Sequence, residues 1–275
     1  MTSNITAQHL LDMSGHQEHP DYLVARGILL GGGLTGIVEL LPDGTVINTP
    51  WPGDRRLESQ KDIRTEAQAY HRIAQHFDGH IRFVKLIEFS SVEHILTIEY
   101  MPHGTLRDYL QSNGQDITIN QRFSWIKAMA EGLDLLHSIS IIHCDLTPHN
   151  LFLDSELELK IADFGCCSID QSTSSGVADA RFYRPQASWK LPASFDDDLF
   201  ALGSCIYEVL TGSPPFENIC SPQVRALYRL SQFPDLAGLY FSDIIRDCWL
   251  QRATSARSVY SRILQSWPAD SNSDS

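Results

Sequence analysis

The spacing of apolar residues in the first hundred positions predicts β-strands and one helix. Apolar runs on both sides of a Pro-Asp-Gly turn at 42–44 predict a hairpin between Ile28 and Val46, because glycine tolerates the positive φ of such a turn. Between Ser59 and Phe77, apolar residues recur at three- and four-residue steps, which predicts an amphipathic helix with Ser59 as its N-cap. Two further strand-like runs lie at 81–89 and 93–101.

Beyond Gly104 the apolar spacing changes to that of helices. Thr105 and Asp108 have the spacing of a capping box, and Asn120 is the predicted N-cap of a long helix with an apolar face. Two more helices are predicted, one buried and one near the end of the chain. They lie at 199–210 and 255–267.

This change of pattern predicts two lobes. We expect an N-terminal extension over 1–19, a first lobe over 20–102, a second lobe over 103–268 and a disordered tail over 269–275. The predicted fold class is α+β, with a small antiparallel β-rich lobe that carries one helix and a larger, mainly helical lobe.

Charge and cysteine content narrow the classes of function and location. The chain has 34 acidic and 21 basic residues, and its net charge of −13 argues against nucleic acid or an anionic membrane as the partner. Its six cysteines show no C-x-x-C spacing, which indicates a reducing compartment. There is no signal-peptide pattern and no long apolar run. We therefore expect a cytoplasmic protein, with a nuclear location left open.

A glycine-rich pattern in the first lobe points to phosphate binding. Gly31, Gly33 and Gly36, followed by Val38, form G-x-G-x-x-G-x-V. Glycines let backbone N–H groups approach phosphate oxygens without a Cβ in the way. By itself the pattern also fits a glycine-rich hairpin that binds no ligand.

Three polar residues in the second lobe form a more specific pattern. Asp145 and Asn150 lie in His-Cys-Asp-Leu-Thr-Pro-His-Asn, and Asp163 begins Asp-Phe-Gly. In order and spacing these motifs resemble those of the eukaryotic protein kinases. The resemblance implies a bilobal protein-kinase-like fold that uses ATP and Mg²⁺. It implies that Asp145 accepts the proton of the substrate hydroxyl and that Asn150 and Asp163 hold the metal.

The resemblance extends over most of the chain and implies further roles. Glu66 corresponds to the glutamate of the N-lobe helix, and Asp198 to the aspartate that anchors the catalytic loop. Glu99 and Met101 lie in the expected hinge that binds adenine, after Ile98 as gatekeeper. Two segments, HCDLTPHN and VINTPWPG, are also similar to fungal protein-kinase-like sequences.

Several cations of the kinase pattern are absent from this sequence. Asn48 stands where the strand after the glycine loop should carry lysine, while Cys144 replaces the arginine of H-R-D and Thr147 replaces a frequent lysine. Loss of a preorganised charge-stabilising donor typically costs about 2.7 to 4 kcal/mol. Asn48 alone is therefore predicted to make a very slow enzyme, unless Arg56 reaches the phosphates as a substitute.

The end of the activation segment also departs from the pattern. Gln186 stands where A-P-E has its glutamate, and either Arg252 or Arg257 would be the lost partner of that glutamate.

Three functions remain open at this point. The first is a protein kinase, of Ser/Thr rather than Tyr type, with an unknown protein substrate or partner and acting as a monomer. The second is a pseudokinase that serves as a binding or scaffold module, which Asn48 favours. The third is a small-molecule phosphotransferase, because such enzymes share the H-x-D-x-x-x-x-N loop.

Overall fold

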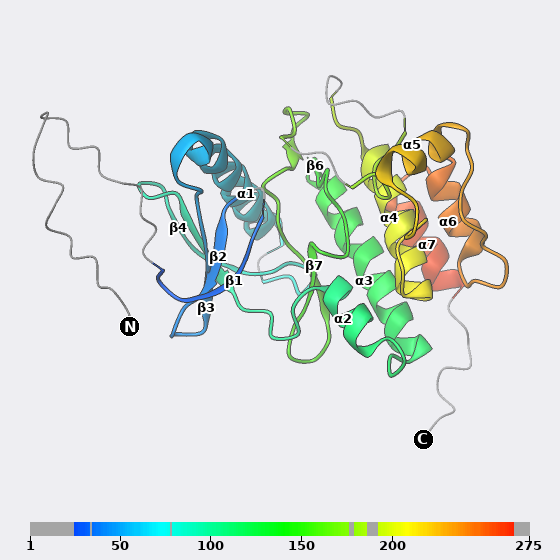
Figure 1. Cartoon of the computed structure of the whole chain (residues 1–275), viewed down its shortest axis with the longest axis horizontal. Helices are drawn as coiled ribbons and strands as arrows, with labels where there is room; N and C mark the ends of the chain where they lie inside the picture. The colour runs from blue at the N-terminus through cyan, green and yellow to red at the C-terminus, as the bar shows by residue number, and fades with distance from the viewer. Residues whose placement is uncertain (1–24, 34, 78, 176–178, 186–191, 267–275) are drawn as a thin grey trace, which may run out of the picture.

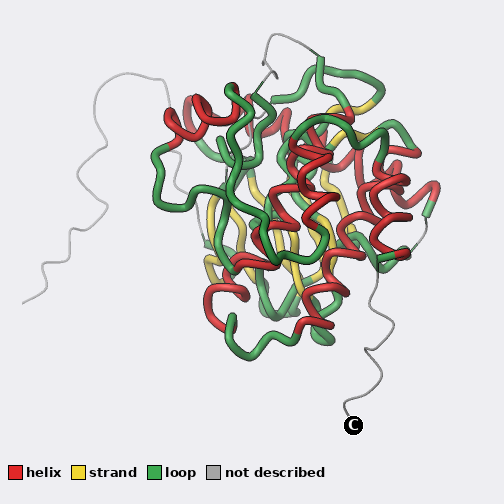
Figure 2. The backbone as a smooth tube through the Cα atoms, turned by 90° about the vertical axis from the view of Figure 1, so that its right-hand side faces the viewer, coloured by secondary structure: helices red, strands yellow, loops and turns green. Residues whose placement is uncertain are grey.

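The computed structural model describes residues 25–33, 35–77, 79–175, 179–185 and 192–266, so the predicted extension 1–19 and tail 269–275 lie outside it. Figure 1 shows a sheet with helix α1 (Arg56–His76) at one end and the other helices at the opposite end. Viewed from the helical end, the helices stand in front of the strands (Figure 2). The structure confirms the predicted bilobal α+β fold, and we call the two parts the N-lobe and the C-lobe.

The N-lobe is built on a five-stranded antiparallel sheet in the order β1-β2-β3-β5-β4. Its strands are β1 (Ile28–Gly32), β2 (Ile37–Leu40), β3 (Thr45–Thr49), β4 (Leu86–Ser90) and β5 (Ile95–Glu99). The predicted hairpin is the β2–β3 pair, and Gly44 in its turn has a φ of 85°. The glycine-rich pattern forms the preceding connection, from β1 into β2.

The start of helix α1 differs from the prediction. The helix begins at Arg56, directly after a short 3₁₀ turn over Gly53–Arg55, so its first turn is already formed before Ser59. Ser59 lies inside the helix, and its hydroxyl accepts a hydrogen bond from the backbone N–H of Trp51 at 2.9 Å. The expected N-cap is therefore wrong, and Ser59 instead connects the helix to the segment after β3.

The C-lobe consists of helices with two short strand pairs, β6–β9 and β7–β8. Its elements are α2 (Leu106–Asn113), α3 (Ile119–Ser138), β6 (Ile141–Ile142), β7 (Leu151–Leu153), β8 (Leu159–Ile161), β9 (Ser168–Ile169), α4 (Phe195–Thr211), α5 (Ser221–Arg229), α6 (Ser242–Trp249) and α7 (Ala256–Gln265). Helix α3 runs through the middle of the lobe (Figure 1). In the described part of the chain, no helix is both long and apolar enough to cross a lipid bilayer.

Two helices start at other residues than predicted, because of the side chains that cap them. Helix α3 is capped by Thr118, whose hydroxyl accepts from the N–H of Gln121 at 3.1 Å, so Asn120 is a helical residue and not the cap. Helix α4 starts before 199 because Ser194 and Asp197 form a capping box. Thr105 is the N-cap of α2, since its hydroxyl accepts from the N–H of Asp108 at 3.1 Å, but the Asp108 carboxylate accepts from the Thr105 hydroxyl at 2.7 Å instead of from the backbone N–H that a capping box requires.

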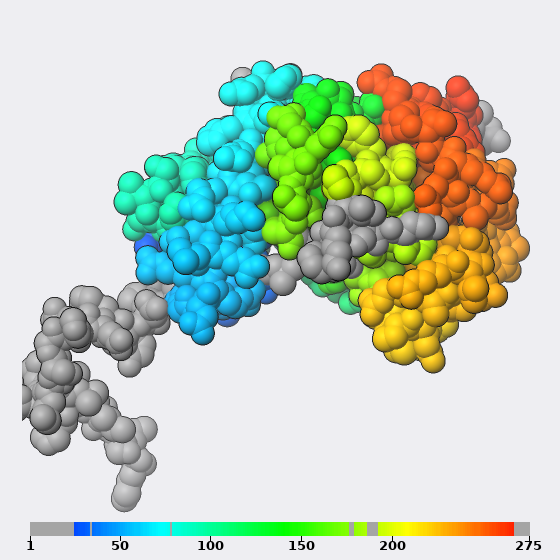
Figure 3. Space-filling model, turned by 90° about the horizontal axis from the view of Figure 1, so that it is seen from above, coloured from blue at the N-terminus to red at the C-terminus, as the bar shows by residue number. Residues whose placement is uncertain are grey.

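One continuous apolar core joins the two lobes. Phe164 is fully buried, with ring centroids 5.0 Å from Tyr70 of α1 and 6.4 Å from Phe83. The predicted strand at 81–89 is shorter than expected, because Val84 donates its backbone N–H to Ile161 of β8 and the strand begins only at Leu86. The N-lobe and C-lobe atoms adjoin directly in Figure 3. This shared core fixes the surfaces that face each other across the lobe boundary.

Candidate active site

A cavity of about 650 Å³ between the lobes collects most of the residues that the motifs singled out. Those that line it are Gly31, Gly33, Val38, Asn48, Glu66, Glu99, Met101, Asn150 and Asp163. Gly36 and Asp145 do not line the cavity themselves, but each lies next to a residue that does. A Cβ on Gly36 would collide with Asn48, and Asp145 is hydrogen-bonded to Asn150.

One part of the cavity wall is apolar. Val84, Met101 and Ala162 form a small buried cluster against which Phe152 packs. An apolar slot of this kind suits an aromatic base. Sequence reasoning missed Val84, Phe152 and Ala162, although Ala162 directly precedes Asp163 and Phe152 lies in a run of three apolar residues directly after Asn150.

The carboxylate of Glu99 is turned toward the sheet and the C-lobe. It accepts from the backbone N–H of Lys85 at 2.7 Å and from Nζ of Lys160 at 2.8 Å. This ion pair fixes the chain where it passes from the N-lobe into the C-lobe. The Glu99 side chain is therefore engaged by these partners, and its backbone groups are the part of Glu99 that remains for a ligand.

Asp198 of α4 binds the backbone of the loop that carries Asp145. The two carboxylate oxygens of Asp198, which is 1% exposed, accept from the backbone N–H groups of His143 and Cys144 at 2.8 and 2.9 Å. The fully buried His143 ring lies 3.1 Å from the carbonyl oxygen of Ala162. His143 thus braces the loop, and the two motif segments are bound to each other.

Asp145 and Asn150 form a rigid pair. The Asn150 side-chain amide donates to the Asp145 backbone oxygen at 2.7 Å and to its carboxylate at 3.0 Å. Burial is the main cause that raises the pKa of Asp145 to about 6. The carboxylate is therefore mostly ionised at neutral pH and oriented to accept a proton.

Comparison with known proteins now assigns the family. A family model described as "Protein kinase domain" matches residues 53–267. The chain belongs to the protein kinase family. The matched residues begin after β3, so the glycine-rich loop and Asn48 precede them.

Relatives of several kinase types are similar to this chain. Mitogen-activated protein kinase kinase kinase 17 of Arabidopsis thaliana is 31% identical over 179 residues, which cover 62% of this chain and 48% of that protein. Serine/threonine-protein kinase plk-2 of Caenorhabditis elegans is 32% identical over 212 residues, covering 73% and 32%. Tyrosine-protein kinase receptor svh-2 of the same species is 30% identical over 197 residues, covering 65% and 18%. The chain spans less than half the length of each.

The donor set of the kinase cleft fits Mg²⁺ bound together with a nucleotide. Asp163 supplies a carboxylate and Asn150 an amide oxygen, and hard Mg²⁺ prefers such oxygen ligands. Among the described residues, no three His, Cys, Asp or Glu side chains form a metal-holding group. Phosphate oxygens would therefore have to complete the coordination, as is usual for nucleotide-bound Mg²⁺.

Asn48, which the sequence pattern places at the kinase lysine position, is a neutral amide. It lies in β3, is 6% exposed, and its side-chain N–H group lies 3.4 Å from Glu66 Oε2 and 3.3 Å from Thr35 Oγ1. Its own Oδ1 is buried without a hydrogen-bond partner in the structure. Asn48 thus links β3 to Glu66 of α1, but it carries no positive charge.

The cleft is correspondingly acidic. No Lys or Arg is among the described residues that line the cavity. Burial, followed by the nearby Asp163 carboxylate, raises the pKa of Glu66 well above its ordinary value, and burial also raises the pKa of Asp163. A cation bound near Asp163 would relieve this electrostatic cost.

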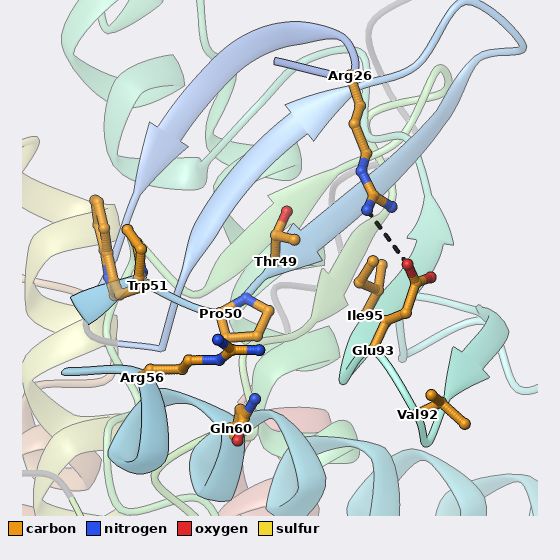
Figure 4. A pocket seen from close by; sticks show the side chains of 10 residues that line it. Arg26, Thr49, Pro50, Trp51, Arg56, Gln60, Val92, Glu93 and Ile95 are labelled. Carbon is orange, nitrogen blue, oxygen red and sulfur yellow. Dashed lines mark hydrogen bonds and ion pairs between the residues drawn. The ribbon is translucent and has the colours of Figure 1, made fainter. Parts of the chain in front are cut away.

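Arg56 does not supply the missing charge. It lines a separate cavity of about 310 Å³ together with Arg26, Trp51 and Gln60, at the beginning of α1 (Figure 4). The expectation that Arg56 reaches toward the phosphate region is therefore wrong. Its place on the first turn of α1 directs it to this other surface.

The end of the activation segment is only partly described. Gln186 lies outside the described residues. Arg184 forms an ion pair with Asp197 of the α4 capping box at 2.7 Å, and Arg257, one of the two expected partners of position 186, pairs with Asp134 of α3 at 2.7 Å.

Proposed function

We propose that this chain is a protein kinase that transfers phosphate from ATP to a Ser or Thr hydroxyl of a protein, at a rate reduced by Asn48. The observation that carries the proposal is the rigid Asp145–Asn150 pair beside Asp163, at one cavity with an apolar slot. The family membership supports the reaction class. The names of plk-2 and its relatives favour Ser and Thr.

Each residue would have a separate task in the reaction. Asp145 would orient the substrate hydroxyl and take up its proton, and Asn150 would hold the Asp145 carboxylate in place. Asp163 and Asn150 would hold Mg²⁺, which supplies charge neutralisation at the phosphates when it is bound. The glycine-rich loop would cover the phosphates with its backbone N–H groups.

Asn48 would slow the reaction without abolishing it. Phosphoryl transfer depends on positioning and electrostatic stabilisation, and one lost donor typically reduces the rate by about a hundred- to a thousandfold. The short amide preserves the link to Glu66, so the helix stays in place. The residues on the magnesium side are all retained.

A transfer assay tests this proposal. We expect the native chain with ATP and Mg²⁺ to label a generic protein substrate slowly, and Asp145→Asn to label it at least about tenfold more slowly. Equal labelling by the two chains would reject the enzyme and favour the second candidate, a pseudokinase. That candidate is supported by the unpartnered Oδ1 and the absent charge at Asn48.

Thermal unfolding tests the nucleotide site by itself. A ligand that binds only the folded chain must raise the melting temperature. We expect ATP with Mg²⁺ to stabilise the native chain and to stabilise Asp163→Asn less. No shift at millimolar nucleotide would argue against nucleotide binding in either candidate.

A further inference from the structure

A charged side chain of helix α1 crosses from the N-lobe to the C-lobe. Arg72 donates two parallel hydrogen bonds to the carboxylate of Asp170, from Nη1 to Oδ1 at 2.7 Å and from Nη2 to Oδ2 at 2.6 Å. Its Nη1 also donates to the carbonyl oxygen of Ile139 at 3.3 Å. A bidentate guanidinium–carboxylate pair fixes orientation as well as distance. Arg72 therefore ties one turn of α1 to the C-lobe.

The backbone that carries Asp170 is itself fixed in the C-lobe. Asp170 directly follows β9, which pairs with β6. Its backbone N–H donates to the carbonyl oxygen of Ser140 at 3.0 Å. Its φ of 51° lies in the left-handed region, which aspartate adopts more readily than most residues. Arg72 is thus bound to a carboxylate that does not move independently of the C-lobe.

At the cleft, α1 is held by a weaker directional contact. The hydrogen bond from Asn48 to Glu66 is 3.4 Å long, which exceeds the usual range of about 2.7 to 3.2 Å. Its donor is a neutral amide, and a hydrogen bond with a charged donor is roughly twice as strong as a neutral one. The contact that would be an ion pair with lysine is therefore weak in this chain.

Between these two points, α1 meets the C-lobe through an apolar contact. The ring of Tyr70 stands edge-on to that of Phe164, with an interplanar angle of 88°. Burial of apolar surface favours such contact but has little directional preference. It keeps α1 against the C-lobe, whereas the ion pair of Arg72 determines how the helix is turned.

We propose that Arg72 and Asp170 are positioning residues, whose ion pair holds α1 so that Glu66 stays beside Asn48 in the cleft. The pair would take over part of the task of the absent lysine–glutamate ion pair. The proposal rests on the proposed function, because it gives both residues a part in phosphate transfer. Neither is among the described residues that line the cavity, so their effect would pass through Glu66, which does line it.

Hydrogen exchange without nucleotide tests whether the ion pair holds the helix. We expect Arg72→Gln and Asp170→Asn each to speed amide exchange in α1, relative to α7, by about 2- to 5-fold, the effect of a good ion pair that is partly exposed. Asparagine is chosen because it also adopts a positive φ readily. The double variant should exchange no faster than Arg72→Gln alone, since both changes remove the same contact.

Arg246→Gln is the matched control for this measurement. It removes an ion pair with Asp243 within α6, which lies in the C-lobe, and it should leave exchange in α1 unchanged. Unchanged α1 exchange in both test variants would overturn the proposal. An equal effect of the control, or effects of the two test variants that add up in the double variant, would overturn it as well.

Rates of phosphate transfer in two backgrounds test the role in the reaction. Asn48→Lys places a cation beside Glu66 and gives α1 a second ion pair. Arg72→Gln should therefore lower the transfer rate by about 2- to 5-fold in the native chain, and by less than about 1.5-fold in Asn48→Lys. Equal losses in both backgrounds would overturn the positioning role alone. No transfer by any chain, Asn48→Lys included, would instead reject the proposed function itself.

Discussion

At the scale of single residues, Asn48 determines the electrostatic character of the cleft. A short neutral amide keeps the contact with Glu66 but leaves Glu66 and Asp163 in a cavity without Lys or Arg among its described lining. Burial then acts on these carboxyl groups without a compensating charge. A Mg²⁺ ion bound there would consequently have to provide the neutralisation that lysine would share.

The raised pKa of Asp145 makes the free energy of unfolding depend on pH. Its pKa is raised from 3.8 to about 6, mainly by burial, so the folded chain binds more protons than the unfolded chain between these pH values. Its contribution to the free energy of unfolding therefore falls as the pH rises from about 4 to 6. We expect Asp145→Asn to be more stable than the native chain at pH 7 by about 2 to 3 kcal/mol, with little difference near pH 4.

Urea unfolding across this pH range, without divalent cations, measures the difference. The difference between the chains should grow between pH 4 and 6 and then level off. A constant difference at every pH would mean that the Asp145 carboxyl does not titrate with a raised pKa.

The sequence identified the residues whose spacing is fixed by chemistry and missed those placed by tertiary contacts. Asp145, Asn150 and Asp163 could be selected because their order along the chain is itself a pattern. Arg72 and Asp170 carry no such signal, since their contact joins residues that lie far apart in the chain. Ser59 was singled out as a cap but serves as a link instead.

At the scale of elements, apolar spacing predicted the long helices but not the short helices α5 and α6, and the start of each predicted helix depended on single hydrogen bonds. Thr118 and Asn120 are both good N-cap residues by type, and only the geometry of the chain before α3 decides between them. Likewise, the start of α4 depends on Arg184, which holds the capping Asp197 from another segment. Such boundaries cannot be derived from local sequence.

Thr118 and Asn120 offer a matched pair for testing the cap of α3. Thr118→Ala removes the acceptor for the Gln121 N–H and should lower the free energy of unfolding by about 1 kcal/mol. Asn120→Ala should change it by less than about 0.5 kcal/mol, because Asn120 is an exposed residue within the helix. Equal losses in denaturant unfolding would contradict the assigned cap.

Helices α2 and α4 are joined by a buried ion pair. Arg107 of α2 donates to Glu208 of α4 at 2.7 Å, and the Glu208 side chain is fully buried. Arg107→Ala leaves this carboxylate without its counter-charge and should cost about 3 to 5 kcal/mol in unfolding free energy. Adding Glu208→Leu should restore part of that loss, and a further loss of similar size would show that the pair is not coupled.

At the scale of the whole molecule, the cleft exists because one core joins two lobes of different architecture. The change from β-rich to helical patterning predicted both lobes. The contact of Phe164 with Tyr70, which fixes how the lobes face each other, joins residues far apart in sequence. The size and polarity of the cavity follow from that long-range packing and could not be derived from spacing alone.

The proposed function requires that Asp145 serves phosphate transfer in this kinase and that the uncharged Asn48 slows it. The most direct measurement compares the initial rate of phosphate transfer from ATP for the native chain, Asn48→Lys and Asp145→Asn. We predict that Asn48→Lys is about a hundred- to a thousandfold faster than the native chain, and that Asp145→Asn is slower than both. A native rate equal to that of Asp145→Asn, or no gain with Asn48→Lys, would contradict the account.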